Sequence, residues 1–231
     1  MENAQESRYL KKWYSGSYKT CYYTGAIGIV YGLVHKLMEI KHKKSVTFSR
    51  VLEVGAGNGE HFSFVKHKFD EYYMTDIQEI DLGSGLEDPR IILKQADCTN
   101  LGTFEDGYFD RVIATCLLVH LKEPGIALTE WRRVVKTGGE ITIYIAPEPG
   151  FLLTLIRKAF IWPKTRKMGI LDPEYFAYSE HINHYPRMNT LVKDVFRNDK
   201  IKRRRFPFKF SSWQFSLFEI LDIKIAKKSN D

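Results

Sequence analysis

VLEVGAGNGE, residues Val51–Glu60, predicts a buried strand that runs directly into a glycine-rich turn and then a helix. Val51, Leu52 and Val54 are apolar and mostly β-branched, as in a parallel strand that is covered on both faces. The glycines provide backbone dihedrals that other residues avoid, and they let a ligand approach the main chain closely. Because open α/β sheets bind ligands at the carboxyl ends of their strands, this turn is a candidate cofactor site.

The residues around the turn indicate which class of cofactor it can bind. A dinucleotide fold places glycine or alanine where this chain has Glu60, whose negative charge is a poor neighbour for a pyrophosphate. A phosphate-binding P-loop is excluded because no Gly-Lys-Ser/Thr sequence follows the turn. S-adenosylmethionine carries no phosphate. Glu53 suits its cationic end, directly or through water, while the loop amides face its carboxylate.

Two of the strands predicted after the turn end in carboxylates. Asp76 lies about twenty residues beyond the turn, the spacing at which a carboxylate accepts hydrogen bonds from both ribose hydroxyls. Asp97 could accept from an adenine amino group, with Ala96 and Cys98 lining the ring. The predicted strands are 71–76, 90–98, 109–116 and 136–145, the last preceded by a helix at 125–135.

Together these segments resemble the class I S-adenosylmethionine-dependent methyltransferases, particularly the small-molecule, methyltransferase type 11-like branch related to quinone-biosynthesis and sugar or lipid methyltransferases. The resemblance covers about residues 49–147 and is most specific at EVGAGNG (53–59), FDRVIA (109–114) and EWRRVVKTGG (130–139). Thr137 departs from the family, which usually has proline there. The resemblance implies an α/β fold with a Rossmann-like, doubly wound, seven-stranded mixed sheet.

The resemblance also implies which residues hold S-adenosylmethionine and its product, S-adenosylhomocysteine. They are Glu53, Gly55, Ala56, Gly57, Gly59, Asp76, Ile77, Asp97, Cys98 and Thr115, with Tyr14 and Tyr18 as candidate lid residues. Related enzymes use N-terminal helices to cover the cofactor, which excludes water and holds the methyl group for attack. The alternative for most of the N-terminal aromatic residues is that they fill the seam between helix and core.

A single domain is predicted, because 231 residues suffice for one α/β core and no repeat or linker is visible. It divides into an N-terminal helical cover (1–45), a cofactor-binding core (46–147), a substrate lid (148–198) and a C-terminal strand pair (199–231). Apolar residues from Ile29 to Ile40 recur at helical spacing. Residues 151–162 predict an amphipathic lid helix followed by basic residues, for which membrane contact is the minority alternative.

Three histidines are candidate catalytic residues that could remove a proton from an acceptor hydroxyl. His181 and His184 are three residues apart, which would place both on one side of a helical turn if the segment is helical. His120 follows the fourth strand, where the loop faces the methyl group in the family. At least one of His181 and His184 is expected to cap a helix, about 190–197, or to bond a backbone carbonyl. No metal is predicted, because neither a third ligand nor a carboxylate after the fourth strand is present at suitable spacing.

The resemblance implies methyl transfer from S-adenosylmethionine to a small-molecule or glycan acceptor, with a hydroxyl of a sugar or surface-polysaccharide precursor preferred. A lipid or quinone precursor is the next alternative. A nucleic acid is disfavoured, because the Asp/Asn-Pro-Pro-aromatic tetrad and the Pro-Cys pair of such enzymes are absent. The remaining alternatives are an RNA methyltransferase that uses the basic run Lys202–Arg205, more often a charged strand edge, and a non-catalytic cofactor-binding module.

Charge and cysteine content add weaker expectations. A net charge of +7 suits an acidic partner, whether nucleic acid, anionic lipid or phosphorylated substrate, but also an ordinary basic surface. The three cysteines have no disulfide or zinc spacing and favour a reducing cytoplasm. The segment Met1–Lys12 is unlike a signal peptide. We therefore expect a cytoplasmic monomer or homodimer, with peripheral membrane contact as an alternative.

Overall fold

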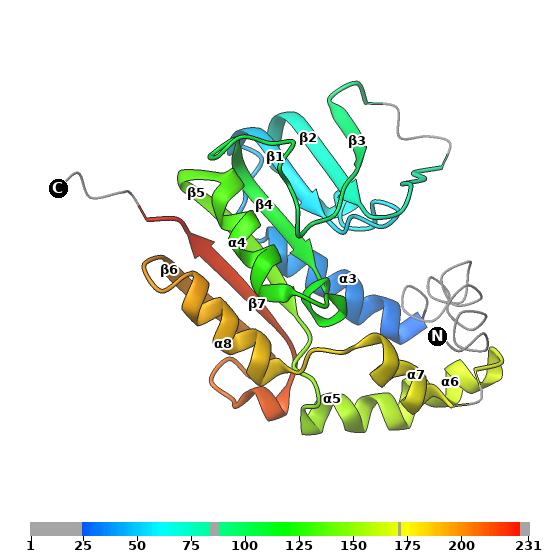
Figure 1. Cartoon of the computed structure of the whole chain (residues 1–231). Coiled ribbons are helices and arrows are strands. Elements are labelled where there is room, and N and C mark those ends of the chain that lie inside the picture. Colours follow the sequence, from blue (N-terminus) through cyan, green and yellow to red (C-terminus); the bar gives the residue numbers. More distant parts are fainter. Residues whose placement is uncertain (1–24, 84–87, 171, 227–231) are drawn as a thin grey trace.

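A seven-stranded sheet forms the centre of the molecule in the computed structural model, which describes residues 25–83, 88–170 and 172–226 (Figure 1). The strand order is β3-β2-β1-β4-β5-β7-β6, in which only β7 runs antiparallel to its neighbours. This confirms the predicted mixed sheet. The strands are β1 (Thr47–Val54), β2 (Lys68–Asp76), β3 (Ile91–Gln95), β4 (Phe109–Thr115), β5 (Val135–Ile145), β6 (Lys200–Pro207) and β7 (Ser216–Lys224).

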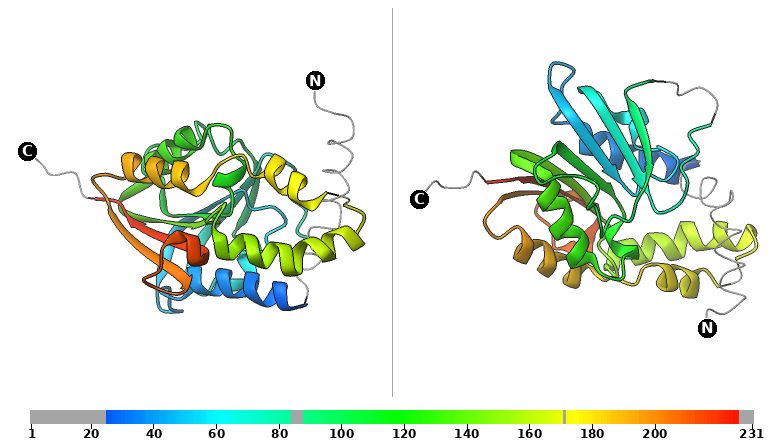
Figure 2. Two further views of the ribbon diagram at one scale, coloured as in Figure 1. Left: turned by 90° about the horizontal axis from the view of Figure 1, so that it is seen from below. Right: turned by 45° about the horizontal axis from the view of Figure 1, so that its top comes forward.

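Helices cover both faces of the sheet. Helix α3 lies on one face, and α4 and α8 lie on the other, so that the sheet is the middle layer (Figure 2). Helices α5, α6 and α7 gather beyond the carboxyl ends of the parallel strands (Figure 1). The helices are α3 (Gly25–Glu39), α4 (Pro124–Val134), α5 (Phe151–Ile156), α6 (Trp162–Lys167), α7 (Pro173–Glu180) and α8 (Tyr185–Val195).

Strand β1 occupies the middle of the sheet, as its apolar sequence predicts. Its last four residues are buried, and it pairs in parallel with β2 on one side and β4 on the other. Val51, Leu52 and Val54 have no exposed surface and belong to the main hydrophobic core. Burial on both faces fixes the position of the glycine turn that follows.

The prediction of a helix directly after the glycine turn is wrong. Residues 55–67, which join β1 to β2, contain a single 3₁₀ turn, Phe62–Phe64. Helix α3, from before β1, packs against the turn instead, with the His35 ring stacked 5.0 Å from that of Phe64.

The segment between β5 and β6 is helical. The predicted helix at 151–162 is present and extends further, as α5, a π-helical turn (Arg157–Ile161) and α6, which ends at Lys167. The helix predicted at about 190–197 is α8, which begins earlier, at Tyr185. His184 holds the position before α8, but its side chain makes no capping hydrogen bond.

The predicted C-terminal strand pair is confirmed as antiparallel β6 and β7. The basic run on β6 is largely neutralised by acidic side chains of β7. Arg203 and Arg205 both bind the buried Glu219, and Arg204 binds Asp222 at 2.8 Å. These pairs favour the predicted charged edge strand over a free phosphate-binding run.

Candidate active site

The glycine turn presents its main chain at the carboxyl end of β1. Gly55, Gly57 and Gly59 all have positive φ angles, between 55° and 74°. A Cβ atom on Gly55 would lie 2.8 Å from the Leu117 side chain, so this position needs glycine for space as well as for conformation. Two amides of the turn donate to carboxylates, that of Gly57 to Asp76 at 3.0 Å and that of Asn58 to Glu60 at 3.1 Å.

Glu53, near the end of β1, has a buried carboxylate in which only one of the two oxygens accepts a hydrogen bond from a described residue. The Tyr72 hydroxyl donates to Oε2 at 2.8 Å, while Oε1 is buried and has no hydrogen-bond partner among the described residues. Burial raises the pKa of Glu53. A buried carboxylate oxygen without a partner fits a ligand that brings a cationic or N–H donor, such as the amino group of S-adenosylmethionine.

Asp76, at the end of β2, is held against the turn. Its two oxygens accept hydrogen bonds from the amides of Gly57 and Gln78, both at 3.0 Å. A carboxylate accepts several hydrogen bonds, so it can still receive the hydroxyls of a ribose. Asp97, at the end of the β3 segment, instead accepts from the amide and hydroxyl of Thr99 and does not line the cavity described next.

A cavity of about 400 Å³ extends from the glycine turn to helices α5, α6 and α7. Of the predicted cofactor residues, the cavity is lined by Gly55, Ala56, Gly57, Asp76 and Thr115. Five others do not line it: Glu53, Gly59, Ile77, Asp97 and Cys98. Tyr14 and Tyr18 lie outside the described residues. The cavity is therefore continuous from the predicted cofactor turn to the predicted substrate lid.

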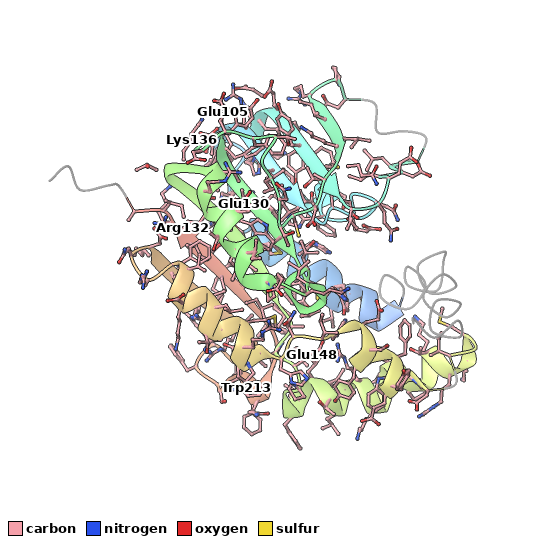
Figure 3. The ribbon with its side chains drawn as sticks, in the orientation of Figure 1. Glu105, Glu130, Arg132, Lys136, Glu148 and Trp213 are labelled. Carbon is pink, nitrogen blue, oxygen red and sulfur yellow. The ribbon has the colours of Figure 1, made fainter. Side chains whose placement is uncertain are left out.

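At the lid end of the cavity, Glu148 organises two side chains. This residue follows β5 and lies where the chain passes from the sheet to α5 (Figure 3). Its Oε1 contacts His181 Nδ1 at 2.6 Å and also the Arg157 guanidinium, while the buried Oε2 has no hydrogen-bond partner among the described residues. Burial would raise the pKa of Glu148, but Arg157 and His181 outweigh it and hold the pKa at about 2.

His181 and His120 both line the cavity and lie side by side. Their ring centroids are 4.7 Å apart with the rings nearly perpendicular. When neutral, His181 donates from Nδ1 to Glu148 and keeps Nε2 as a proton acceptor. His120 likewise donates from Nδ1 to the Glu180 carbonyl at 3.0 Å. Burial and the neighbouring His181 lower the pKa of His120 to about 4, which makes it a weak base.

The structure separates the third predicted histidine from the other two. His184 is exposed at the start of α8 and does not line the cavity. His181 ends α7, and the extended residues between it and α8 turn His184 away from a shared helical face. The expected helical pairing of His181 and His184 is therefore wrong.

The sequence analysis did not identify Glu148, which lies beside the cavity, or Cys116, which lines it. Glu148 follows a parallel strand, as Asp76 and Asp97 do, and this position was a usable signal. Cys116 lines the cavity with φ of 52°, the one positive φ at a non-glycine residue in the described ranges. Burial raises the pKa of its thiol to about 12, so it stays neutral and is not a nucleophile.

Comparisons with known proteins agree with this geometry. A family model described as a methyltransferase domain matches residues 52–143. A phosphatidylethanolamine N-methyltransferase of Cereibacter sphaeroides is 35% identical over 41% of this chain and 49% of that protein. A ubiquinone/menaquinone biosynthesis C-methyltransferase UbiE of Cupriavidus metallidurans is 28% identical over 62% of this chain and 64% of that protein. The chain thus spans about half to under two thirds of these relatives.

A solved structure of a SAM-dependent methyltransferase from Archaeoglobus fulgidus matches with a TM-score of 0.55 and 15% identity, covering 84% of this chain and 93% of that one. Similarity at this low identity shows the fold alone. The family-model match and the shared fold together confirm the predicted resemblance.

Proposed function

We propose that this member of the class I S-adenosylmethionine-dependent methyltransferase family transfers a methyl group to a small amphipathic acceptor with a hydroxyl or similarly acidic group. The single observation that carries the proposal is the continuity of the cavity. The glycine turn and Asp76 line one end, and His181 and His120 line the other. A donor at the turn and an acceptor beside the histidines would share one enclosed space.

The glycine-turn end of the cavity is assigned to S-adenosylmethionine because Glu53 and Asp76 have carboxylate oxygens that can accept further hydrogen bonds. Glu53 Oε1 would accept from the amino group of S-adenosylmethionine, directly or through water, and Asp76 from its ribose hydroxyls. When bound, the cofactor supplies an activated methyl group on a sulfonium. The protein's part is then to orient the acceptor and exclude water.

At the acceptor end, His181 is the proposed general base. Glu148 holds the His181 ring through Nδ1, so Nε2 can accept a proton from an acceptor hydroxyl. The positive charge that forms on His181 would be stabilised by the Glu148 carboxylate, as in other base–carboxylate pairs. His120, with its lowered pKa, is better suited to hydrogen bonding or packing than to proton removal.

The wall of the acceptor end favours an amphipathic molecule. Leu153, Ile161, Trp162 and Phe176 line it together with the two histidines. The relatives are named for phosphatidylethanolamine and for ubiquinone and menaquinone, which also combine polar and apolar parts. A sugar hydroxyl is the second candidate acceptor, because the Glu148–His181 pair suits an alcohol that does not ionise at neutral pH.

The test is release of S-adenosylhomocysteine in the presence of three acceptors: a quinol with a short isoprenoid tail, dispersed phosphatidylethanolamine and a nucleotide sugar. We expect turnover with one of the two amphipathic acceptors. His181→Gln should abolish most of that turnover, and His184→Gln, an exposed histidine of the same segment, should not change it. Turnover with the nucleotide sugar alone would support the second candidate. No turnover, or equal loss in both variants, would contradict the assignment of His181.

A further inference from the structure

A group of exposed apolar side chains lies on two adjoining segments at the lid end of the molecule. One segment is α5, and the other is the connection between β6 and β7, which contains the short turn Trp213–Phe215. Figure 3 labels Trp213 beside the start of α5. We call the group the aromatic rim, and its members are Phe151, Leu155, Phe208, Phe210 and Phe215.

The two segments of the aromatic rim are joined by direct contacts. The Phe151 and Phe215 rings lie 6.1 Å apart, and the Gln214 side chain accepts from the Phe151 amide at 3.1 Å. The rim is nonetheless open to solvent, with Phe151 61% and Phe210 95% exposed. Clustered aromatic residues at this exposure indicate an interaction surface rather than part of the core.

Basic residues predominate on the segments that carry the aromatic rim, although Arg157 is buried against Glu148. Residues 151–167 contain five basic residues and no acidic residue, and Lys209 lies between the rim residues Phe208 and Phe210. Arg166 and Lys167, on α6, are exposed. Lys158, also exposed, has the α7 residue Glu174 as an ion-pair partner at 3.8 Å. Exposed phenylalanines, with Lys209 between two of them and exposed basic residues further along the same helical segment, complement an anionic lipid surface, into which aromatic side chains insert at headgroup depth.

The same helices form the wall of the cavity. Leu153 on α5, Arg157 and Ile161 in the π turn, and Trp162 on α6 line the cavity, whereas Phe151 and Leu155 are exposed. One face of this segment therefore meets the acceptor end of the cavity and another meets solvent. No helix within the described ranges is long and apolar enough to cross a bilayer.

We propose that the aromatic rim and its basic border dock this protein on the surface of an anionic lipid bilayer. Phe151, Phe208 and Phe210 enter the headgroup region, and Lys209, Arg166 and Lys167 face the lipid phosphates. Docking does not depend on methyl transfer. If the acceptor is a lipid, docking also places the lid end of the cavity next to the membrane that holds it.

The test is co-sedimentation with vesicles, without cofactor or acceptor. Vesicles of phosphatidylcholine with one third phosphatidylglycerol should bind the protein, vesicles of phosphatidylcholine alone should bind it poorly, and high salt should release it. Phe151→Ser/Phe210→Ser should weaken binding at least about tenfold, because each ring loses its apolar contact with lipid. Arg166→Glu/Lys167→Glu should weaken it by about tenfold or more.

Two variants serve as matched controls. Ile40→Ser removes an exposed apolar residue away from the rim, and Lys193→Glu reverses an exposed charge on α8. Both should bind the anionic vesicles as the unaltered protein does, and all variants should unfold at similar temperatures. The proposal is overturned if the anionic vesicles are not bound, or if controls and rim variants lose binding equally. It is also overturned if the rim variants abolish self-association or RNA binding and leave vesicle binding unchanged.

Discussion

Two buried groups of side chains in this protein share the same chemistry: a glutamate, an arginine and histidines. The first, the Glu39 cluster, lies between α3 and the sheet and contains Glu39, Arg111, His61 and His35. The second, the Glu148 cluster, lies at the lid end and contains Glu148, Arg157, His181 and His120. They differ in how many oxygens of the carboxylate accept hydrogen bonds.

In the Glu39 cluster both carboxylate oxygens are occupied. Arg111 donates to Oε2 and Oε1 at 2.9 and 2.6 Å, and His61 contacts Oε1 at 3.0 Å. Glu39 and Arg111 have no exposed side-chain surface. Burial would raise the pKa of Glu39, but His61 and Arg111 outweigh it and hold the pKa well below its usual range. A buried pair with two parallel hydrogen bonds suits a structural role.

In the Glu148 cluster one carboxylate oxygen has no partner among the described residues. Arg157, His181 and His120 line the cavity, as His35 and His61 of the Glu39 cluster also do. The same residue types can therefore stabilise a fold or prepare a reaction. The two clusters differ in the carboxylate: both oxygens of Glu39 accept hydrogen bonds, whereas Glu148 Oε2 has no partner among the described residues. The largest effects should follow from removing the arginines.

Arg111→Met should lower the free energy of unfolding by about 3–5 kcal/mol, because it leaves a buried carboxylate without its ion-pair partner. Arg157→Met should cost less, about 1–2 kcal/mol, since Glu148 keeps His181 and lies beside the cavity. Urea denaturation measures both. The double variant Glu39→Met/Arg111→Met should recover much of the loss. A larger cost for Arg157→Met than for Arg111→Met would reverse the comparison.

Replacing His181 should affect activity more than stability, and replacing His61 should lower stability. His181→Gln should lower kcat by about 10²–10⁴-fold, the usual contribution of a general base, while changing stability by less than about 1 kcal/mol. His61→Gln should lower the unfolding free energy by about 1–3 kcal/mol, because it disrupts the contact to buried Glu39. Kinetics and urea denaturation on the same samples measure both effects. A His181→Gln protein that is unstable but fully active would contradict the proposed role.

Stability should fall by on the order of 5 kcal/mol as the pH drops from 6.5 towards 4. Burial lowers the pKa of His35 to about 3 and that of His67 to about 4, so in this range the unfolded chain binds protons that the folded protein does not. The stabilisation from Glu148, whose pKa is about 2, persists above its unfolded pKa and disappears only as the pH falls through about 2. Urea denaturation across this range measures the slope.

His67→Phe should flatten that slope. The ring of His67 packs edge-on against Phe48 at 4.8 Å, and a phenylalanine can keep this contact without binding a proton. An unchanged slope in this variant would show that His67 does not contribute to the pH dependence.

The smallest effects should come from the basic run on β6. Lys202→Ala, at an exposed position, should change stability by less than about 0.5 kcal/mol, whereas Arg204→Ala should cost about 1 kcal/mol through its pair with Asp222. Thermal unfolding measures both. Equal effects would show that the pairing between β6 and β7 has no energetic consequence.

The sequence predicted the sheet well because its strands depend on local patterns, whereas the predicted cofactor residues stay a prediction. Apolar runs that end in Gly55, Asp76 or Asp97 carry their signal within a few residues. The Glu39 cluster had no such signal, since Glu39 and Arg111 are far apart in sequence and meet only after α3 packs on the sheet. The missing helix after the turn was also unpredictable from the glycine pattern, because α3 takes its place against Phe64.

The acceptor end was predicted only in part. His181 and His120 were found as titratable residues after strands and in the lid, but spacing alone could not distinguish His181 from His184. Their difference depends on where α7 ends and α8 begins. Glu148 was not identified as a site residue, although it follows the carboxyl end of a parallel strand, as Asp76 does.

Binding of S-adenosylhomocysteine, measured by calorimetric titration, tests the central claim most directly. The protein should bind it and not NADH, and Asp76→Ala should weaken binding at least about tenfold by removing the proposed ribose acceptor. His184→Gln, outside the cavity, should bind as tightly as the unaltered protein. Absence of binding, or a preference for NADH, would contradict the assignment of the glycine turn as a site for S-adenosylmethionine.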